Sequence, residues 1–227
     1  MNWLTKLQET FLEDNRYMWM LEGLGNTLLI TLGALGIGVV IGALIAITKY
    51  FCEGNKKLRF FNWLCDLYTT VIRGIPVTVL LLVFFYIIFV SVKDGVPVAI
   101  VAFGINSGAY VAEIIRSGIM AVDPGQMEAG LSLGFGYIPT MRHIILPQAF
   151  KNVLPPLCNE FIVLLKETAV VGYIGLMDLT YAASRIRDAT YSPFMPLIGS
   201  AASYRLLVMF FTWLVGKLER RLRNSDR

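Results

Sequence analysis

Three ionisable side chains, Arg73, Glu160 and Glu167, lie inside long apolar stretches of the sequence. A charge at the middle of a bilayer costs roughly 3 kcal/mol or more, so it usually faces a partner or a water-filled path. A guanidinium can bind a carboxylate through two parallel hydrogen bonds. The two glutamates can receive an amino group or a cationic side chain. The set therefore predicts a binding site for a small zwitterion.

Position along the chain brings these groups to a similar depth. Arg73 and Glu160 each lie about thirteen residues from the same end of their predicted spans, which is ~20 Å at ~1.5 Å per residue. Glu167 follows two turns further along the helix face of Glu160. Gly74-Ile75-Pro76 breaks the helix after Arg73, and backbone groups freed there add polar contacts, so Gly74 joins the candidate substrate-binding residues. The structural alternative is that Arg73 pairs with Glu160 or Asp66 and holds the helices together.

Composition predicts an integral membrane protein that is entirely α-helical. The chain has 227 residues, of which 56% are hydrophobic and 16% charged, whereas soluble domains carry nearer a quarter charged residues. The mean hydropathy is +0.63. Three cysteines without metal or redox spacing predict small apolar filler, and the single histidine predicts no metal site and no catalytic residues. The net charge of +4 is expected to orient the chain in the membrane, not to bind nucleic acid.

Five apolar stretches are long enough to cross a bilayer. They are expected at residues 23–48, about 60–92 with a kink near Pro76, 96–122, 148–176 and 194–216. Residues 1–22 are predicted to form an amphipathic helix on the membrane surface, 23–221 the transmembrane domain, and 222–227 a basic tail. Residues 177–192 are polar and predict no element.

Smaller patterns inside the spans predict contacts. Ala34, Gly38, Gly42 and Ala46 recur at every fourth position of the first span, which predicts a smooth face for close helix packing. Glu113 and Arg116 are three apart on one helix face and predict an ion pair, with a gate as the minority interpretation. Arg205 interrupts the fifth span and needs a carboxylate partner, for which Glu167 and Asp178 are the candidates.

The distribution of Lys and Arg predicts the orientation of the chain. The segment after the first span and the carboxyl-terminal tail are rich in these residues, whereas the segments on the opposite side mix them with many carboxylates. By the positive-inside rule the amino terminus lies outside and the carboxyl terminus in the cytoplasm.

A polar, glycine-containing loop at residues 124–147 separates the third and fourth spans on that cytoplasmic side. It reads as a short helix, a turn at Gly134 and Gly136, and a second short helix that ends near Pro147. Such a compact helical loop at a membrane face suits a docking surface for a soluble partner.

The loop also carries a motif. Glu128-Ala129-Gly130, Gly134, Ile144 and Leu146-Pro147 resemble, in type and spacing, the EAA loop of permease subunits of ATP-binding-cassette (ABC) importers. Gly130 replaces the usual alanine, which predicts a slightly more flexible turn. Further likeness to the polar-amino-acid branch of this family lies in 73–76 (RGIP), 109–118 (AYVAEIIRSG), 144–149 (IILPQA) and 165–168 (LKET), and extends over roughly residues 23–221.

The resemblance implies the fold of type I importer permeases, with about five spanning helices and a cytoplasmic coupling helix. It implies a second permease subunit, identical or homologous, two ABC ATPase subunits and an extracytoplasmic substrate-binding protein. Glu128, Ala129, Gly130 and Gly134 would then contact the ATPase. No phosphate-binding GxxxxGK[ST] motif occurs in the chain, so ATP and Mg²⁺ are expected on that partner and no cofactor on this chain.

The predicted function is therefore the import of a polar amino acid across the cytoplasmic membrane, with uncompensated glutamates favouring a cationic one. A secondary transporter or channel working without an ATPase is the first alternative. It would predict internal repeats or a selectivity-type loop, and neither is visible. A membrane enzyme is the second alternative, and it would predict clustered catalytic or metal-ligating side chains.

Overall fold

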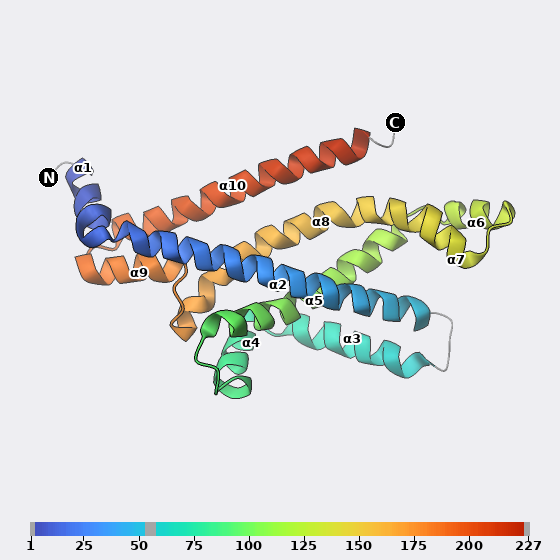
Figure 1. Ribbon diagram of the computed structural model, residues 1–227, viewed down its shortest axis with the longest axis horizontal. Coiled ribbons are helices and arrows are strands. Elements are labelled where there is room, and N and C mark those ends of the chain that lie inside the picture. Colours follow the sequence, from blue (N-terminus) through green and yellow to red (C-terminus); the bar gives the residue numbers. More distant parts are fainter. Residues whose placement is uncertain (1–2, 53–57, 225–227) are drawn as a thin grey trace.

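The computed structural model describes residues 3–52 and 58–224, and every regular element within these ranges is helical (Figure 1). The long helices run roughly along one direction in this view. The α6–α7 loop and the end of α10 lie at one extremity, and the amino-terminal elements with α9 lie at the other. In chain order the elements are α1 (Trp3–Leu7), η1 (Gln8–Leu12), η2 (Glu13–Asn15), α2 (Tyr17–Cys52), α3 (Arg59–Gly74), α4 (Val77–Val83), η4 (Phe84–Ile88), α5 (Gly95–Met120), α6 (Pro124–Ser132), α7 (Tyr137–Thr140), η5 (Met141–Ile145), α8 (Leu146–Glu167), η6 (Thr168–Ile174), α9 (Leu179–Thr190) and α10 (Phe194–Asn224).

Helices α2 and α5 pack closely against each other over a long contact, and small residues make that approach possible. All four members of the predicted strip on α2 are buried: Ala34, Gly38, Gly42 and Ala46. A Cβ added at Gly42 would lie 2.6 Å from Val111 Cγ1, so the two backbones are as close as glycine allows. The predicted packing face is confirmed.

The second predicted span is divided into two helical segments by a sharp bend. Between α3 and the α4–η4 segment the axis bends by 104° at the Gly74–Pro76 break. Pro76 has no backbone N–H, and the residue before a proline prefers extended geometry, which Ile75 adopts with ψ 128°.

Helix lengths and composition support most of the predicted crossings but do not confirm the number five. Three described helices, α2, α5 and α10, are long and apolar enough to cross a membrane, and the bent pair makes a fourth if it counts as one span. Helix α8 has the length, but it carries two internal prolines and charged residues such as Lys151 and Lys166.

Several predicted boundaries differ from the structure. Helix α2 begins at Tyr17 and runs through the boundary expected at 22/23, and α10 continues through the one expected at 221/222. In the loop, α6 and the turn at Gly134, with φ +85°, follow the expectation. The second short helix does not end at Pro147, because α7 and η5 continue directly into α8, where this proline occupies the first turn.

A helix that the sequence analysis did not predict, α9, occupies part of the polar segment 177–192. The Asp178 side chain caps it by accepting hydrogen bonds from the backbone N–H groups of Thr180 and Tyr181, at 3.0 and 2.9 Å. Tyr204 Oη of α10 donates to the same carboxylate at 3.1 Å. The cap therefore also joins α9 to α10.

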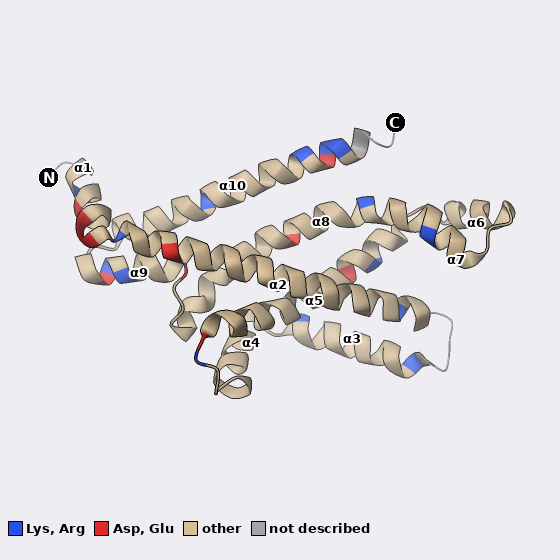
Figure 2. Cartoon of the chain, viewed as in Figure 1, with Lys and Arg blue, Asp and Glu red and all other residues tan. Residues whose placement is uncertain are grey.

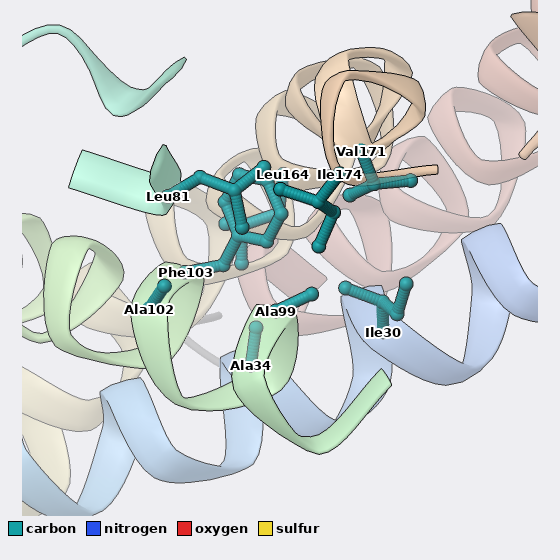
Figure 3. Close-up of a cluster of buried hydrophobic side chains, with 9 residues drawn as sticks. All are labelled: Ile30, Ala34, Leu81, Ala99, Ala102, Phe103, Leu164, Val171 and Ile174. Atoms are coloured by element: carbon teal, nitrogen blue, oxygen red, sulfur yellow. The ribbon is translucent and has the colours of Figure 1, made fainter. Parts of the chain in front are cut away.

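The main hydrophobic core gathers side chains from α2, α4, α5, α8 and η6 (Figure 3). Phe103 of α5 is fully buried at its centre, between Leu81 of α4 and Leu164 of α8. Ser107 lies one helical turn beyond Phe103, and Glu160 one turn before Leu164. The polar groups described next therefore sit directly under this apolar layer.

Candidate functional site

Glu160 is a buried carboxylate in the middle of α8, with 8% of its surface exposed. Ser107 Oγ of α5 donates a hydrogen bond to its Oε1 atom at 2.9 Å. Within residues 3–52 and 58–224, no Lys or Arg lies within ion-pair distance of it. A buried carboxylate with a single neutral donor has capacity for a further donor, which a ligand can supply.

Arg73 is the last residue but one of α3, just before the break, and is exposed. Its guanidinium carbon lies 5.3 Å from the centre of the Tyr110 ring on α5, a cation–π contact. None of the described carboxylates is within ion-pair distance of it. Asp66, one of the two partners considered from the sequence, pairs instead with Lys49 at 2.6 Å.

Helix α5 brings these two candidate residues to one face. Ser107 and Tyr110 are three apart, which places them on the same side of the helix, and they contact Glu160 and Arg73 respectively. Glu167 is half-buried at the carboxyl end of α8, where no hydrogen bond or ion pair in the described part of the chain joins it to Arg73 or Glu160. The structure thus relates Arg73 and Glu160 through a shared neighbour, and Glu167 lies two turns beyond Glu160 on α8, where the two carboxylates repel each other.

Sequence reasoning missed both contacts on α5. Their only local signal was a serine and a tyrosine three positions apart in the most apolar part of the predicted third span. Gly74, the remaining candidate, is the last residue of α3 and exposed, with no atom within 4 Å of an added Cβ. Its backbone therefore borders open space beside Arg73.

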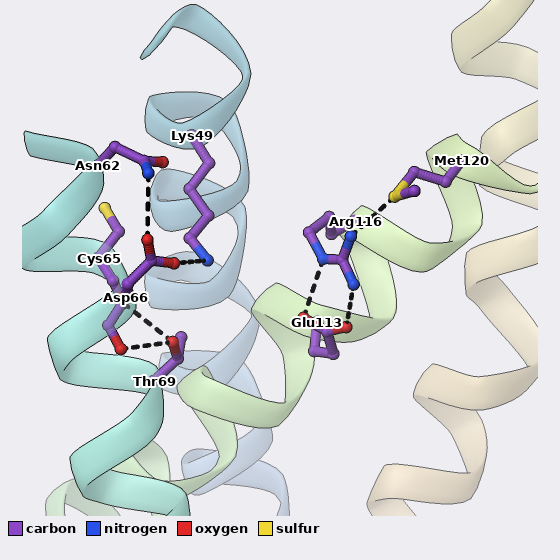
Figure 4. Close-up of polar contacts among 8 residues, drawn as sticks. All are labelled: Lys49, Asn62, Cys65, Asp66, Thr69, Glu113, Arg116 and Met120. Atoms are coloured by element: carbon purple, nitrogen blue, oxygen red, sulfur yellow. Dashed lines mark hydrogen bonds and ion pairs between the residues drawn. The ribbon is translucent and has the colours of Figure 1, made fainter. Parts of the chain in front are cut away.

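Other charged residues form local pairs (Figure 4). Arg116 donates to Glu113 through both Nε, at 3.0 Å, and Nη2, which confirms the predicted pair. The same figure shows Lys49 reaching Asp66 across the α2–α3 contact. Arg205 is exposed, and neither carboxylate proposed for it is within ion-pair distance.

The 124–147 loop presents an apolar surface next to its motif. Glu128 and Ala129 are exposed on α6. Exposed large apolar side chains accompany them: Leu131, Leu133, Phe135, Tyr137 and Ile138. An apolar surface of this kind, flanked by polar residues, is typical of a protein interface.

Gly130 is buried and packs against Thr140 so closely that a Cβ would collide with the threonine methyl group. The expectation of a more flexible turn at Gly130 is therefore wrong, because this glycine lets α6 pack closely against Thr140 at the end of α7. Gly134 provides the turn, in the left-handed conformation.

The loop is joined firmly to both neighbouring helices. Val122, Ile145 and Ala149 form a small buried cluster, with Ile119 and Met127 packed against it. Gln148 Nε2 donates to Gln126 Oε1 at 3.3 Å, and Asn152 Nδ2 donates to the Gly118 carbonyl at 3.3 Å. Helices α5, α6 and α8 therefore meet as one packed corner.

Comparison with known proteins gives a consistent result. Residues 38–224 match the family described as binding-protein-dependent transport system inner membrane component. The arginine transport system permease protein ArtQ of Bacillus subtilis (strain 168) is 39% identical over 219 residues, 92% of this chain and 94% of that protein. The putative glutamine transport system permease protein GlnP of Rickettsia bellii (strain RML369-C) is also 39% identical, over 210 residues covering 91% of this chain and 94% of that one.

Solved structures agree with these relatives. A crystal structure of an amino acid ABC transporter with histidines superposes with a TM-score of 0.83 at 43% identity, over 93% of this chain and 98% of that one. An inward-facing structure of the MetNI methionine ABC transporter gives a TM-score of 0.76 at 19% identity, over 91% of this chain and 97% of that one. The second likeness is one of fold.

Proposed function

Because the chain belongs to the family of binding-protein-dependent transport system inner membrane components, we propose that it carries polar amino acids, cationic ones included, through the membrane. It is the non-catalytic permease subunit of an ABC importer and works with a separate ATPase and a binding protein. The relatives named for arginine and glutamine support a substrate whose side chain ends in hydrogen-bond donors.

The observation that carries the substrate proposal is the environment of Glu160. This carboxylate is buried under the main core, accepts one neutral hydrogen bond and has no cationic neighbour in the described structure. A cationic or amide group of a substrate supplies the missing donor. Arg73, over the ring of Tyr110, keeps the edges of its guanidinium available for a substrate carboxylate, with the Gly74 backbone beside it and Glu167 as a further acceptor towards the outside.

The coupling proposal rests on the geometry of α6. Its exposed Glu128 and Ala129, the packed Gly130 and the turn at Gly134 present the loop to an ATPase subunit. The assembly we propose has two ATPase subunits, which bind ATP and Mg²⁺, and a second permease that is identical or homologous. This chain itself then needs no cofactor.

The proposed orientation places α6 and the carboxyl-terminal end of α10 in the cytoplasm, with the amino terminus outside. Figure 2 supports it, because Lys and Arg mark the end of α10 and the α7 region, whereas acidic residues cluster near α1. A single cysteine introduced at Glu128 should react with an impermeant maleimide only in inside-out vesicles. Reaction in intact cells would refute this orientation.

The substrate role is tested with Glu160→Gln in the assembled transporter. Binding of radiolabelled arginine, lysine, glutamine and glutamate is measured on the purified complex without binding protein, so that the latter's affinity does not mask the effect. We expect at least a tenfold loss of affinity for arginine and lysine, since a charge-assisted hydrogen bond contributes about 1.5–3 kcal/mol. Asp188→Asn, on the exposed face of α9, is the matched control. Unchanged affinity in Glu160→Gln with normal assembly would refute the assignment, and ATP-independent transport by this chain alone would favour the secondary-transporter alternative.

A further inference from the structure

Two uncharged residues of α5 contact the charged side chains that are proposed to bind the substrate. Ser107 Oγ donates a hydrogen bond to Glu160 Oε1 at 2.9 Å, and the guanidinium carbon of Arg73 lies 5.3 Å from the centre of the Tyr110 ring. These contacts join α5 to α8 and to α3, the two helices that contribute the site's charges.

The Ser107 hydroxyl has little freedom to move. The residue is fully buried, and a Cβ at Gly38 would lie only 2.8 Å from Ser107 Oγ, so the backbone of α2 presses against the hydroxyl from behind. Its one proton is engaged by Oε1 of Glu160. Because Ser107 satisfies a single oxygen, the other one, Oε2, remains the acceptor for an incoming group.

Tyr110 holds Arg73 in a complementary way. A guanidinium over an aromatic face is attracted to the ring through its flat surface, which leaves its N–H groups at the edges. Those edges form the fork that matches a carboxylate. Within the described residues the Tyr110 hydroxyl makes no hydrogen bond, so the ring carries the contact with Arg73.

We propose that Ser107 and Tyr110 are positioning residues that fix the distance between Arg73 and Glu160 and thereby select the substrate. Their Cβ atoms, three residues apart on one helix, are about 5–6 Å from each other, and each anchors one charge. The site then takes an α-amino acid whose carboxylate binds Arg73 and whose side chain ends in a donor that reaches Glu160. This inference rests on the proposed function, because it assigns supporting roles to that same site.

The test compares ligands that differ at one end only, on the purified complex without binding protein. Lysine and norleucine differ in the side-chain ammonium group, and lysine and 1,5-diaminopentane differ only in the carboxylate. Ser107→Ala is expected to lower lysine affinity about tenfold and to leave norleucine affinity unchanged. Ser117→Ala, an exposed serine on the same helix, should change neither.

Tyr110→Leu should weaken lysine and norleucine binding by a similar factor of about five to ten, because both bring a carboxylate to Arg73. Tyr110→Phe keeps the ring and should retain wild-type affinity. If the leucine variant does not assemble, Tyr110→Met, of similar volume but without a π face, provides the same comparison. Thermal midpoints of all variants establish that the fold is intact.

Outcomes separate this inference from the proposed function. If Glu160→Gln lowers lysine affinity but Ser107→Ala leaves the lysine-to-norleucine ratio unchanged, the positioning role is refuted and the site stands. An equal loss for lysine and norleucine in Ser107→Ala also overturns the inference, because Glu160 would then bind the α-amino group. If neither Glu160→Gln nor Arg73→Gln alters binding, the proposed substrate site itself falls.

Discussion

The close contact between α2 and α5 predicts how much stability is lost when one methyl group is added between the two helices. In Gly42→Ala, the new Cβ would lie 2.6 Å from Val111 Cγ1 and 2.8 Å from the backbone nitrogen of Ala112. Rotation of the Val111 side chain moves its Cγ1 atom, but its Cβ, 2.7 Å away, and the Ala112 nitrogen move only with the backbone of α5. We therefore expect an overpacking cost of about 1–3 kcal/mol.

Gly36→Ala is the matched control on the same helix, because Gly36 is exposed and nothing lies within 4 Å of its Cβ position. Replacing glycine by alanine inside a helix is favourable by about 0.5–1 kcal/mol in both variants. That gain cancels between them, so the difference in unfolding free energy reports the steric cost alone. For a chain of this size, 1 kcal/mol corresponds to about 2–4 °C in the unfolding midpoint.

The assay is reversible unfolding of the detergent-solubilised protein, followed by circular dichroism. Gly42→Ala should unfold about 1–3 kcal/mol more easily than Gly36→Ala. Adding Val111→Ala should recover only part of the loss, because the backbone contact remains. Equal stabilities for the two glycine variants would show that α2 and α5 are not held at the distance described.

Three further predictions concern other contacts. Gly130→Ala restores the alanine of the motif but should separate ATP hydrolysis from transport, because the Cβ meets both the methyl group and the Oγ1 atom of Thr140. Adding Thr140→Ala, which removes both atoms, should restore coupled uptake, and failure of this rescue would contradict the packing explanation. Asp178→Ala should destabilise the protein by about 1–2 kcal/mol in a thermal melt through loss of the α9 cap, whereas Asp178→Asn, still a good cap, should lose less, and the reverse order would argue against capping. Lys49→Met should change the unfolding free energy by no more than about 1 kcal/mol, since Asp66 is half exposed in this pair; a larger loss would indicate a buried network.

The sequence predicted what depends on local spacing. The strip on α2, the α6 helix with its glycine turn and the Glu113–Arg116 pair each follow from neighbours within two helical turns, and the structure confirms them. The α9 helix also had a local signal, since Leu179, Ala182, Ala183 and Ile186 recur at helical spacing and are all buried. The polar composition of its segment obscured that pattern.

What the sequence could not predict depends on distant segments. The role of Ser107 depends on Glu160, which lies 53 positions later in the sequence and accepts its hydrogen bond. The need for glycine at position 130 follows from the contact with Thr140. The size of the 104° bend depends on the packing of α4 against the main core. Such features follow from tertiary packing, which local periodicity does not contain.

The packed corner at α6 has a mechanical consequence. The loop packs against Ile119 of α5 and is joined to α8 through Gln148, and the bond from Asn152 to Gly118 ties these two helices together. If an ATPase docks on α6 as proposed, a push there would reach both helices at once. Such a movement would carry Ser107 on α5 and Glu160 on α8 together. Arg73 is held against α5 by Tyr110, so the proposed binding site would move with this corner as one unit.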